Sequence, residues 1–474
     1  MRSTLVLLVL ALALPAAAQD AGPAPAGFDR ARAQRDALAL TEGLIRLDTR
    51  NPPGNERVAV DFLAERLRAL EGVEVHVLDV GDGRANLLAR LKAGAPKRRP
   101  VIVMGHLDVV GTQDERWSTP PLTPTVKDGF LYGRGAIDDK GPLAAMLAAL
   151  LQLHAARATL ERDVIYLATA AEEGGPDVGI DRVLSDHRAL LGDAELALNE
   201  GGRVRLDGGR VKSVNIQTTE KLYHEVRATA KGPSGHGSVP LPDNALAALA
   251  RAVARVHAWR APLHLIATTR RYFELLAGIE ADPAMAKAMR EIGSPDPKVQ
   301  QAALEWMAKV PQHDAVLRAG CALTKLEGGF RVNVIPSEGT ATWNVRTVPG
   351  EDVAAIVSAM QEAGGEPAVR FELVGEAEVP PPESPVTTAL YRALEAAAKA
   401  MAPGATVLPF MSTGATDGAA LRAIGIPTYG ILPFPLELAD ELRMHGDDER
   451  VPVAALGWGT ELIYRTLQGV CGPE

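Results

Sequence analysis

The sequence contains little cysteine and few aromatic residues. Only two cysteines, Cys321 and Cys471, occur in 474 residues, too few for a disulfide framework or a thiolate metal site. Phe, Trp and Tyr together make up 4%, so the interior must be packed mainly from aliphatic side chains. Export would permit a Cys321–Cys471 disulfide, and two buried free thiols are an equally good alternative.

The sequence also lacks an excess of positive charge. The chain has 50 Lys and Arg against 59 Asp and Glu, a net charge of −9, and its longest basic run is residues 97–99. A nucleic-acid-binding protein needs a cationic face that replaces phosphate counterions, so we expect no nucleic-acid partner. The 47% of hydrophobic and 23% of charged residues are ordinary globular values, which argues against a disordered or fibrous protein.

Long apolar runs are absent except near the N-terminus. Residues 5–14 are apolar, follow a positive charge at Arg2 and precede a small-residue segment that ends at Ala18. This pattern predicts a signal peptide of residues 1–18, followed by an Ala/Gly/Pro linker at 19–28. An uncleaved membrane anchor is the alternative, but this apolar segment is shorter than the roughly 20 residues that a spanning helix needs. We therefore expect an exported protein, periplasmic or secreted, with no membrane contact after cleavage.

The apolar pattern of the rest of the chain predicts an α/β fold. Residues 100–104 and 163–170 are almost wholly apolar, which is typical of strands covered by helices on both faces. Strands and helices alternate over 29–212 and again over 376–474, which predicts a three-layer α/β/α catalytic domain. Residues 213–375 contain strands of alternating polarity and further helices, so we expect them to form a smaller α+β lid domain inserted into the first.

Clusters of acidic and imidazole residues follow several predicted strands or lie in the turns near them. They comprise His106 and Asp108, Asp138 and Asp139, Glu172 and Glu173, Glu200, and His445. Sites in open α/β sheets form at the carboxyl ends of strands, so the clusters together predict one site. Each cluster alone is also compatible with a solvated turn.

The donor set suits two divalent metal ions. His106, Asp138, Glu173, Glu200 and His445 carry −3, which two divalent ions and a bridging hydroxide bring to zero, so that the site can be buried. Glu172 is then left beside the metals without being needed to bind them, as a general base requires. Asp108 lies two residues after His106 and can orient its imidazole ring.

The order of these motifs resembles the co-catalytic dizinc exopeptidases, a family that includes aminoacylase-1, carboxypeptidase S, acetylornithine deacetylase and carnosine-type dipeptidases. The resemblance rests on residues 44–49, 51–54, 105–108, 133–141, 172–175, 199–202 and 445–449. It implies that the two ions are zinc, although cobalt or manganese would also suit these ligands. The implied zinc ligands are His106, Asp138, which bridges both ions, Glu173, Glu200 and His445. Glu172 is the implied general acid/base, Asp108 the residue that supports the histidine ligand, and the peptide between Asp138 and Asp139 is expected to be cis.

The resemblance also extends to the lid domain. Residues 232–238 resemble the lid segment whose histidine, here His236, stabilises the tetrahedral intermediate, frequently in the active site of a partner subunit. Asn333 and Arg346 match positions that contact substrate, although both are equally compatible with a sheet edge. A homodimer through the lid is implied, unless the mostly polar helical segment 270–316 blocks or replaces that contact.

One segment departs from the family pattern. Many relatives carry an Arg directly after an Asp–small-residue pair near the substrate carboxylate, and residues 414–422 lack it. Either lid residues bind the carboxylate here, or the substrate presents none at that place.

The sequence therefore predicts a metal-dependent hydrolase that cleaves the amide bonds of small peptides or N-acyl amino acids, as a carboxypeptidase- or dipeptidase-like exopeptidase. A metal-bridged hydroxide would attack, with Glu172 as general base. The alternative is an exported peptide- or metal-binding protein without turnover, which would need the ligands but not Glu172. A dimetal phosphoesterase is a further alternative, which the lid motif disfavours.

Overall fold

The computed structural model describes residues 22–175 and 177–473. The expected signal peptide, 1–18, and the start of the expected linker lie outside these residues. The chain forms two compact units, one of Met1–Asn215, Thr387–Val407 and Ile431–Glu474, the other of Ile216–Val386 and Leu408–Gly430. No helix within the described part of the chain is long and apolar enough to cross a membrane.

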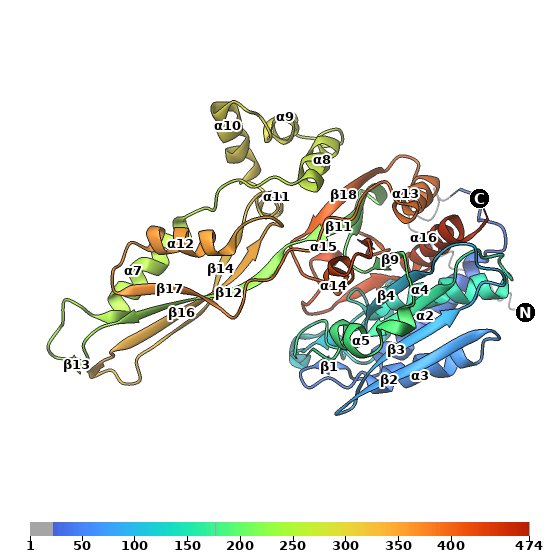
Figure 1. Ribbon diagram of the computed structural model, residues 1–474, viewed down its shortest axis with the longest axis horizontal. Coiled ribbons are helices and arrows are strands. Elements are labelled where there is room, and N and C mark those ends of the chain that lie inside the picture. Colours follow the sequence, from blue (N-terminus) through green and yellow to red (C-terminus); the bar gives the residue numbers. More distant parts are fainter. Residues whose placement is uncertain (1–21, 176, 474) are drawn as a thin grey trace, which may run out of the picture. The chain divides into compact units, whose positions relative to one another are not determined.

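The first unit is built on a mixed β-sheet whose neighbouring strands run in the order β2-β3-β8-β4-β9. Their bounds are β2 Val73–Gly81, β3 Arg84–Leu91, β4 Val101–His106, β8 Val164–Thr169 and β9 Leu196–Asn199. Figure 1 labels β2, β3, β4 and β9 of this sheet. Strands β8, β4 and β9 are parallel, whereas β2, β3 and β8 pair antiparallel. Every residue of β4 and β8 is buried, as the continuous apolar runs predict.

Helices cover this sheet and pack on one another. They are α2 Arg30–Ile45, α3 Arg57–Arg68, α4 Lys140–Ala155, α5 Ile180–Asp186, α6 Arg188–Leu191, α13 Ala389–Met401, α15 Leu438–Glu441 and α16 Val453–Cys471, with a short 3-10 turn at Asp114–Arg116. Helix α4 is alanine- and leucine-rich and buried on nearly all sides, because it lies between the sheet and helices α2 and α16. Helix α2 begins where the Asp29 carboxylate accepts the backbone N–H of Arg32.

Short strands join distant parts of the first unit. They are β1 Arg50–Asn51, β5 Val109–Val110, β6 Thr125–Lys127, β7 Phe130–Tyr132, β10 Arg203–Asp207, β20 Pro435–Leu436 and β21 Arg450–Pro452. Strand β1 pairs in parallel with β5. Strand β21 pairs with β7 so that Arg450 lies opposite Tyr132, which brings the last part of the chain beside the turn that carries Asp138.

The second unit contains a four-stranded antiparallel sheet in the order β14-β16-β12-β17. Its elements are β12 Leu222–Lys231, β13 Gly235–His236, α7 Ala245–Ala258, α8 Ala267–Leu276, α9 Pro283–Glu291, α10 Pro297–Met307, α11 Pro311–Asp314, β14 Gly320–Gly328, β15 Val334–Ile335, β16 Glu338–Thr347, α12 Val353–Gly364, β17 Val369–Val374, α14 Gly418–Ala423 and β19 Thr428–Gly430. Strands β11 Arg210–Glu220 and β18 Thr406–Ser412 run through the boundaries of the units.

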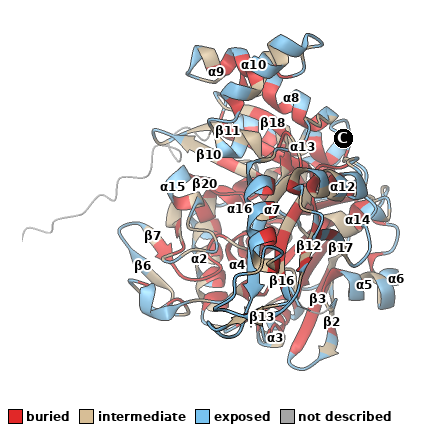
Figure 2. Ribbon diagram, turned by 90° about the vertical axis from the view of Figure 1, so that its left-hand side faces the viewer, coloured by how far each residue is buried: buried red, intermediate tan, exposed pale blue. Residues whose placement is uncertain are grey.

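Two apolar cores hold the second unit together. Helices α7 and α12 lie on one side of the sheet (Figure 1). The strand residues Val226, Trp343 and Phe371 are buried in the core that these helices share with the sheet. Helices α8 to α10 form another core and carry buried residues on one side only (Figure 2). Leu408 and Met411 pack in that core, which is why 408–430 belongs to this unit and the unit extends beyond the predicted lid of 213–375.

Candidate metal centre

Three neighbouring parallel strands deliver predicted site residues to one edge of the sheet. His106 ends β4 and pairs in register with Thr169, the last residue of β8. Glu172 and Glu173 follow β8 within four residues, and Glu200 follows directly on β9. The carboxyl ends of parallel strands meet at the same edge, so this topology gathers residues that are far apart in sequence.

Asp138 lies between the two predicted histidine ligands. Its Oδ1 is 3.0 Å from Nε2 of His106, and its Oδ2 is 3.0 Å from Nε2 of His445. His445 Nε2 is also 3.0 Å from Glu173 Oε1. Two donor atoms bound at ~2.0–2.1 Å to one tetrahedral ion lie about 3.3 Å apart, so these separations suit ligands that share a cation.

Burial and hydrogen bonding support the same assignment. Candidate ligand atoms of His106, Asp138 and Glu173 all lie within 4.8 Å of one another. Glu173 Oε1 is buried and faces His445 Nε2 at 3.0 Å. Because a buried carboxylate oxygen needs a positively polarised partner, this atom is suited to a cation. The residues present therefore fit a metal centre.

The protonation of the histidines has a clear electrostatic cause. Hydrogen bonds to Asp138 and Glu173 raise the pKa of His445 to about 10. Burial opposes protonation of His106, but hydrogen bonds to Asp108 and Asp138 raise the pKa of His106 well above its usual value. Burial likewise opposes ionisation of Asp138, and the two imidazoles lower its pKa. The carboxylates around both imidazoles thus favour positive charge at this place, which a bound cation would supply.

Asp108 connects the histidine to the acidic turn after β8. Its buried carboxylate accepts the backbone N–H groups of Glu172 and Glu173, both at 3.1 Å. The Nδ1 atom of His106 lies 2.9 Å from the backbone oxygen of Asp108 and 3.5 Å from its carboxylate. The ring is therefore oriented mainly by the backbone carbonyl, whereas the carboxylate fixes the position of the Glu172–Glu173 turn.

Asn51 is a site residue that the sequence analysis did not identify. Its Nδ2 donates to Asp108 Oδ2 at 2.8 Å and also to the backbone oxygen of Gly174. In the sequence, Asn51 belongs to the segment 51–54 that carries the resemblance, and no role was assigned to it. The pairing of β1 with β5 is what places it beside Asp108.

Two predicted site residues depend on a left-handed backbone. Ala171, just before Glu172, has φ +61°, and His445 itself has φ +61°. Such a conformation costs a non-glycine residue roughly 1–2 kcal/mol, so the surrounding contacts must hold it in place. The Glu172 carboxylate lies 3.9 Å from His106 Nε2, beside the cluster. The peptide between Asp138 and Asp139 is cis, as the resemblance implies.

Asp139 contacts His106, and Glu200 acts electrostatically on Asp139. Asp139 is buried, and its Oδ2 accepts the backbone N–H of His106 at 3.2 Å. Burial raises the pKa of Asp139 well above its usual value, and the charges of Glu200 and Asp138 raise it further. Among the residues that the structure describes, Glu200 is not a member of the 4.8 Å group.

The predicted lid residues lie in the second unit. His236 is exposed on β13, and its Nδ1 accepts the backbone N–H of Ser238 at 3.1 Å. A neutral ring in this position carries its proton on Nε2, which can then donate outward. The backbone oxygen of Asn333 accepts the N–H of Gly237 at 2.8 Å, so the segments of Asn333 and His236 are joined. Arg346 is half-buried on β16, where its Nε donates to Asn344 and its guanidinium lies over Tyr223.

The segment that departs from the family pattern is held by a buried ion pair. Arg422 Nη2 lies 2.8 Å from Glu220 Oε2, and both side chains are buried. Glu220 also accepts the backbone N–H and the hydroxyl of Thr416. Glu220 therefore neutralises the charge of Arg422 inside the protein. Arg422 does not replace the carboxylate-binding arginine that this segment lacks.

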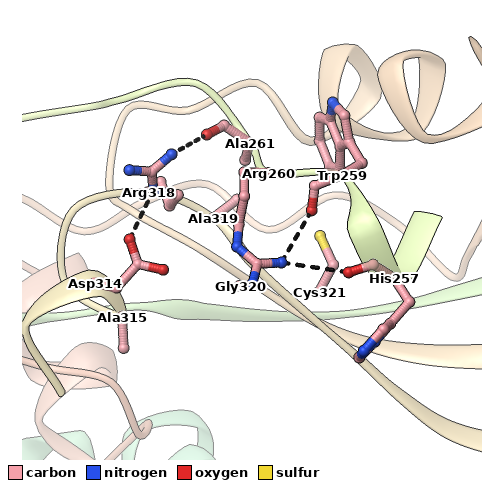
Figure 3. A pocket seen from close by; sticks show the side chains of 10 residues that line it. All are labelled: His257, Trp259, Arg260, Ala261, Asp314, Ala315, Arg318, Ala319, Gly320 and Cys321. Carbon is pink, nitrogen blue, oxygen red and sulfur yellow. Dashed lines mark hydrogen bonds and ion pairs between the residues drawn. The ribbon is translucent and has the colours of Figure 1, made fainter. Parts of the chain in front are cut away.

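The second unit also contains a cavity of about 210 Å³ (Figure 3). Arg260 donates to the backbone oxygens of His257 and Trp259, and Arg318 donates to Ala261 and pairs with Asp314. Both guanidinium groups thus form part of the cavity wall. The cavity contains none of the predicted site residues. Cys321, which also lines it, and Cys471 are free thiols.

Residues 102–469 match the peptidase family M20/M25/M40. The chain belongs to this family. The match covers more than half of the chain and confirms the predicted class, a metal-dependent hydrolase of peptide or N-acyl amide bonds with an α/β catalytic domain and a lid domain. The predicted resemblance to the co-catalytic exopeptidases is confirmed with it.

Relatives within the family are distant in sequence. A probable carboxypeptidase S-like 2 of Dictyostelium discoideum is 26% identical over 78% of this chain and 71% of its own length. Human N-fatty-acyl-amino acid synthase/hydrolase PM20D1 is 25% identical over 80% of this chain and 76% of its own length.

Solved structures share the fold. The M20 family metallo-carboxypeptidase Sso-CP2 from Sulfolobus solfataricus superposes with a TM-score of 0.69 at 19% identity, covering 92% of this chain and 99% of that one. Bacillus subtilis YXEP protein, a dinuclear metal-binding peptidase from the M20 family, gives a TM-score of 0.58 at 15% identity over 93% and 100% of the two chains.

Proposed function

We propose that this protein is an exported dimetal amidohydrolase that cleaves one amide bond in a small peptide or an N-acyl amino acid. The position of Asp138 carries the proposal, because its two oxygens face His106 on one side and His445 on the other at 3.0 Å. One carboxylate between two imidazoles suits a bridge between two ions. Glu172 lies beside this bridge, and we do not assign it as a metal ligand.

The five predicted ligands would divide between the two ions. His445 and Glu173 contact each other and would hold one ion, and His106 with Glu200 would hold the other, with Asp138 shared. Zinc is the proposed metal, since imidazole and carboxylate oxygen are both good zinc ligands. When bound, the ions supply Lewis acidity toward the scissile carbonyl and acidify the attacking water.

The side chains of the protein would move the proton and stabilise the charge. Glu172 would accept the proton of the attacking water and pass it to the departing amine. Asp108 keeps Glu172 in place through the backbone N–H that it accepts. By its resemblance to the family's lid histidine, His236 would donate its Nε2–H to the developing oxyanion, and the contact of Nδ1 with Ser238 supports that tautomer.

The substrate would carry a free carboxylate on the leaving amino acid. Relatives named as carboxypeptidase S-like and as N-fatty-acyl-amino acid hydrolase support this class. Since Arg422 pairs with Glu220, we propose that Arg346 and Asn333 bind the substrate instead. An exposed hairpin that carries Phe330 and Val332 lies next to Asn333 and would suit an apolar acyl chain.

Export and dimerisation complete the proposal. The N-terminal pattern supports a signal peptide of residues 1–18 and a periplasmic or secreted location. Strand β14 lies at an edge of its sheet, and seven of its nine residues, Ala322 to Gly328, are exposed. An exposed edge strand is a template for pairing, so a second copy of the chain would add its own β14 there.

Turnover of a substrate panel tests the function. Dipeptides, N-acetyl amino acids and N-fatty-acyl amino acids are incubated with the metal-loaded protein, and the released amine is measured. Wild type should hydrolyse at least one class, and both EDTA and Glu172→Gln should stop it. A wild type that binds metal but releases no amine from any class would favour the alternative, a binding protein without turnover.

A further inference from the structure

A buried carboxylate lies behind Asp138. The side chain of Glu449 is fully buried and accepts four hydrogen bonds. Its Oε1 accepts the backbone N–H groups of Ile137 at 2.7 Å and Asp138 at 3.1 Å. Its Oε2 accepts Nη1 of Arg134 at 2.6 Å and the backbone N–H of Gly135 at 3.1 Å. Three of the four donors are backbone groups of the turn that carries Asp138.

Glu449 also belongs to the segment that carries the other half of the centre. His445 precedes it by four residues. Arg134, the ion-pair partner of Glu449, donates its Nη2 to the backbone oxygen of Gly446, next to His445, at 2.9 Å. The backbone oxygen of Glu449 in turn accepts the N–H of Gly133 at 3.0 Å. The Arg134–Glu449 pair therefore joins the Asp138 turn to the His445 segment from both sides.

A third segment encloses this pair. Arg134 lies over the ring of Trp117, with its guanidinium carbon 5.2 Å from the ring centroid. Ser118 donates its N–H and its hydroxyl to Asp448, at 2.7 and 2.9 Å. Water is excluded from both partners, because the Arg134 and Glu449 side chains are 2% and 0% exposed.

We propose that Arg134 and Glu449 are positioning residues that set the separation of Asp138 and His445 for metal binding, an inference that rests on the proposed metal centre. His445 needs such support because its side chain is half-exposed and its backbone is left-handed. A buried ion pair contributes little to stability relative to apolar residues of the same volume, so a positioning role accounts for it better than a stabilising one.

Because all four hydrogen-bond partners of Glu449 are donors, Glu449→Gln tests this role. Glu449→Gln keeps the size of the side chain, but an amide nitrogen cannot accept a hydrogen bond. In either orientation, the amide places its NH₂ group against two donors and must displace them. The turn of Asp138 or the contact with Arg134 has to move, while the rest of the core keeps its packing.

The control is a matched carboxylate outside the proposed centre. Glu461 on α16 is also buried, and its carboxylate accepts hydrogen bonds from the guanidinium groups of Arg30 and Arg465. Glu461→Gln therefore also removes a buried negative charge paired with arginine, and it alters no segment that carries a proposed ligand. Arg134→Lys is a milder second variant that keeps the charge but can reach only one of the two oxygens that Arg134 contacts.

The experiment measures zinc binding to the full-length apo protein by calorimetry, with folding checked by circular dichroism. Wild type should bind two ions, and a wild type that binds none would refute the metal centre itself rather than this inference. If wild type binds two ions, Glu449→Gln should lower the affinity for at least one of them 10- to 100-fold. Arg134→Lys should lower that affinity less. Glu461→Gln should bind both ions as wild type does.

Three results would overturn the positioning role. One is a folded Glu449→Gln protein with both affinities within twofold of wild type. Another is a loss of affinity in Glu461→Gln as large as that in Glu449→Gln. Should Glu449→Gln fail to fold, Arg134→Lys decides: wild-type affinities, or failure of this variant to fold as well, would assign the pair to the fold as a whole.

Discussion

Oδ2 of Asp138 lies 3.0 Å from Nε2 of His445, although 307 positions separate the two residues in sequence. The other oxygen of Asp138 is the same distance from His106. A carboxylate held between two imidazoles has its two oxygens directed to two different sites. This arrangement supports the proposal of two cations rather than one.

Removal of the metal should abolish activity and lower stability. Ligands that bind only the folded state stabilise it, by about 4 kcal/mol at a thousandfold excess over Kd. We expect the EDTA-treated protein to show no amide hydrolysis and a lower melting temperature, and two equivalents of zinc to restore both. Metal content by atomic emission, activity and differential scanning fluorimetry provide the measurements. Full activity at less than a tenth of an equivalent of metal would contradict the proposal.

Glu172 and Glu173 should behave differently although they are adjacent. Glu172→Gln removes the proposed base, so kcat should fall about 10²- to 10⁴-fold while two ions remain bound. Glu173→Gln removes a proposed ligand, so one ion should bind more weakly. Single-turnover kinetics with parallel metal titrations separate the two effects. Loss of both ions in Glu172→Gln would assign that residue to the ligand set.

Asn51 should matter for both stability and rate. Asn51→Leu keeps the size of the side chain but removes its hydrogen bonds to Asp108 and Gly174. The Asp108 carboxylate and the Gly174 carbonyl then lose the donor Nδ2. We expect a loss of about 1–3 kcal/mol in unfolding free energy, measured by urea titration, and a lower kcat. Asn55→Leu is the matched control, because Asn55 is exposed on the same turn. Equal effects in both variants would remove Asn51 from the centre.

His236 should act on the transition state rather than on metal binding. His236→Ala should lower kcat about 10²- to 10³-fold, as removal of one oxyanion donor does elsewhere, with metal content unchanged. Ser238→Ala should have a smaller effect, since the backbone N–H of residue 238 still contacts Nδ1. Steady-state kinetics with metal analysis of each variant check this order. A larger loss in Ser238→Ala than in His236→Ala would refute the proposed tautomer role.

The exposed strand β14 predicts an oligomeric state. Leu326 has 59% of its surface exposed on this edge strand. If two copies pair through β14, Leu326→Lys should shift the protein from dimer to monomer, because a lysine on an edge strand opposes pairing. Light scattering after size-exclusion chromatography measures the mass. A monomeric wild type would contradict the pairing.

The main elements near the centre could be predicted because their sequence patterns are strong. The apolar runs at 100–104 and 163–170 correspond to β4 and β8, which are buried along their whole length. The helical segment 270–316 was less clear from sequence. It forms four short helices, three of which begin at Pro283, Pro297 and Pro311, since proline is favoured in the first turn of a helix.

Supporting residues could not be predicted in the same way. Glu449 and Arg134 appeared in the sequence analysis only within the segments 445–449 and 133–141 that carry the resemblance, with no role assigned to either. The two residues lie 315 positions apart in sequence and meet because β21 pairs with β7. Local periodicity contains no information about such a contact, because it depends on how the chain returns through the sheet.

The sequence alone determined which residue types follow the buried strands and the family to which these residues point. Buried strands can be recognised in a sequence because burial imposes a pattern on neighbouring residues. Which carboxylates face one another, and which imidazole each oxygen of Asp138 contacts, is decided only in the folded chain. Those relations depend on distances of about 3 Å between residues hundreds of positions apart, and strand pairing and loop hydrogen bonds set them.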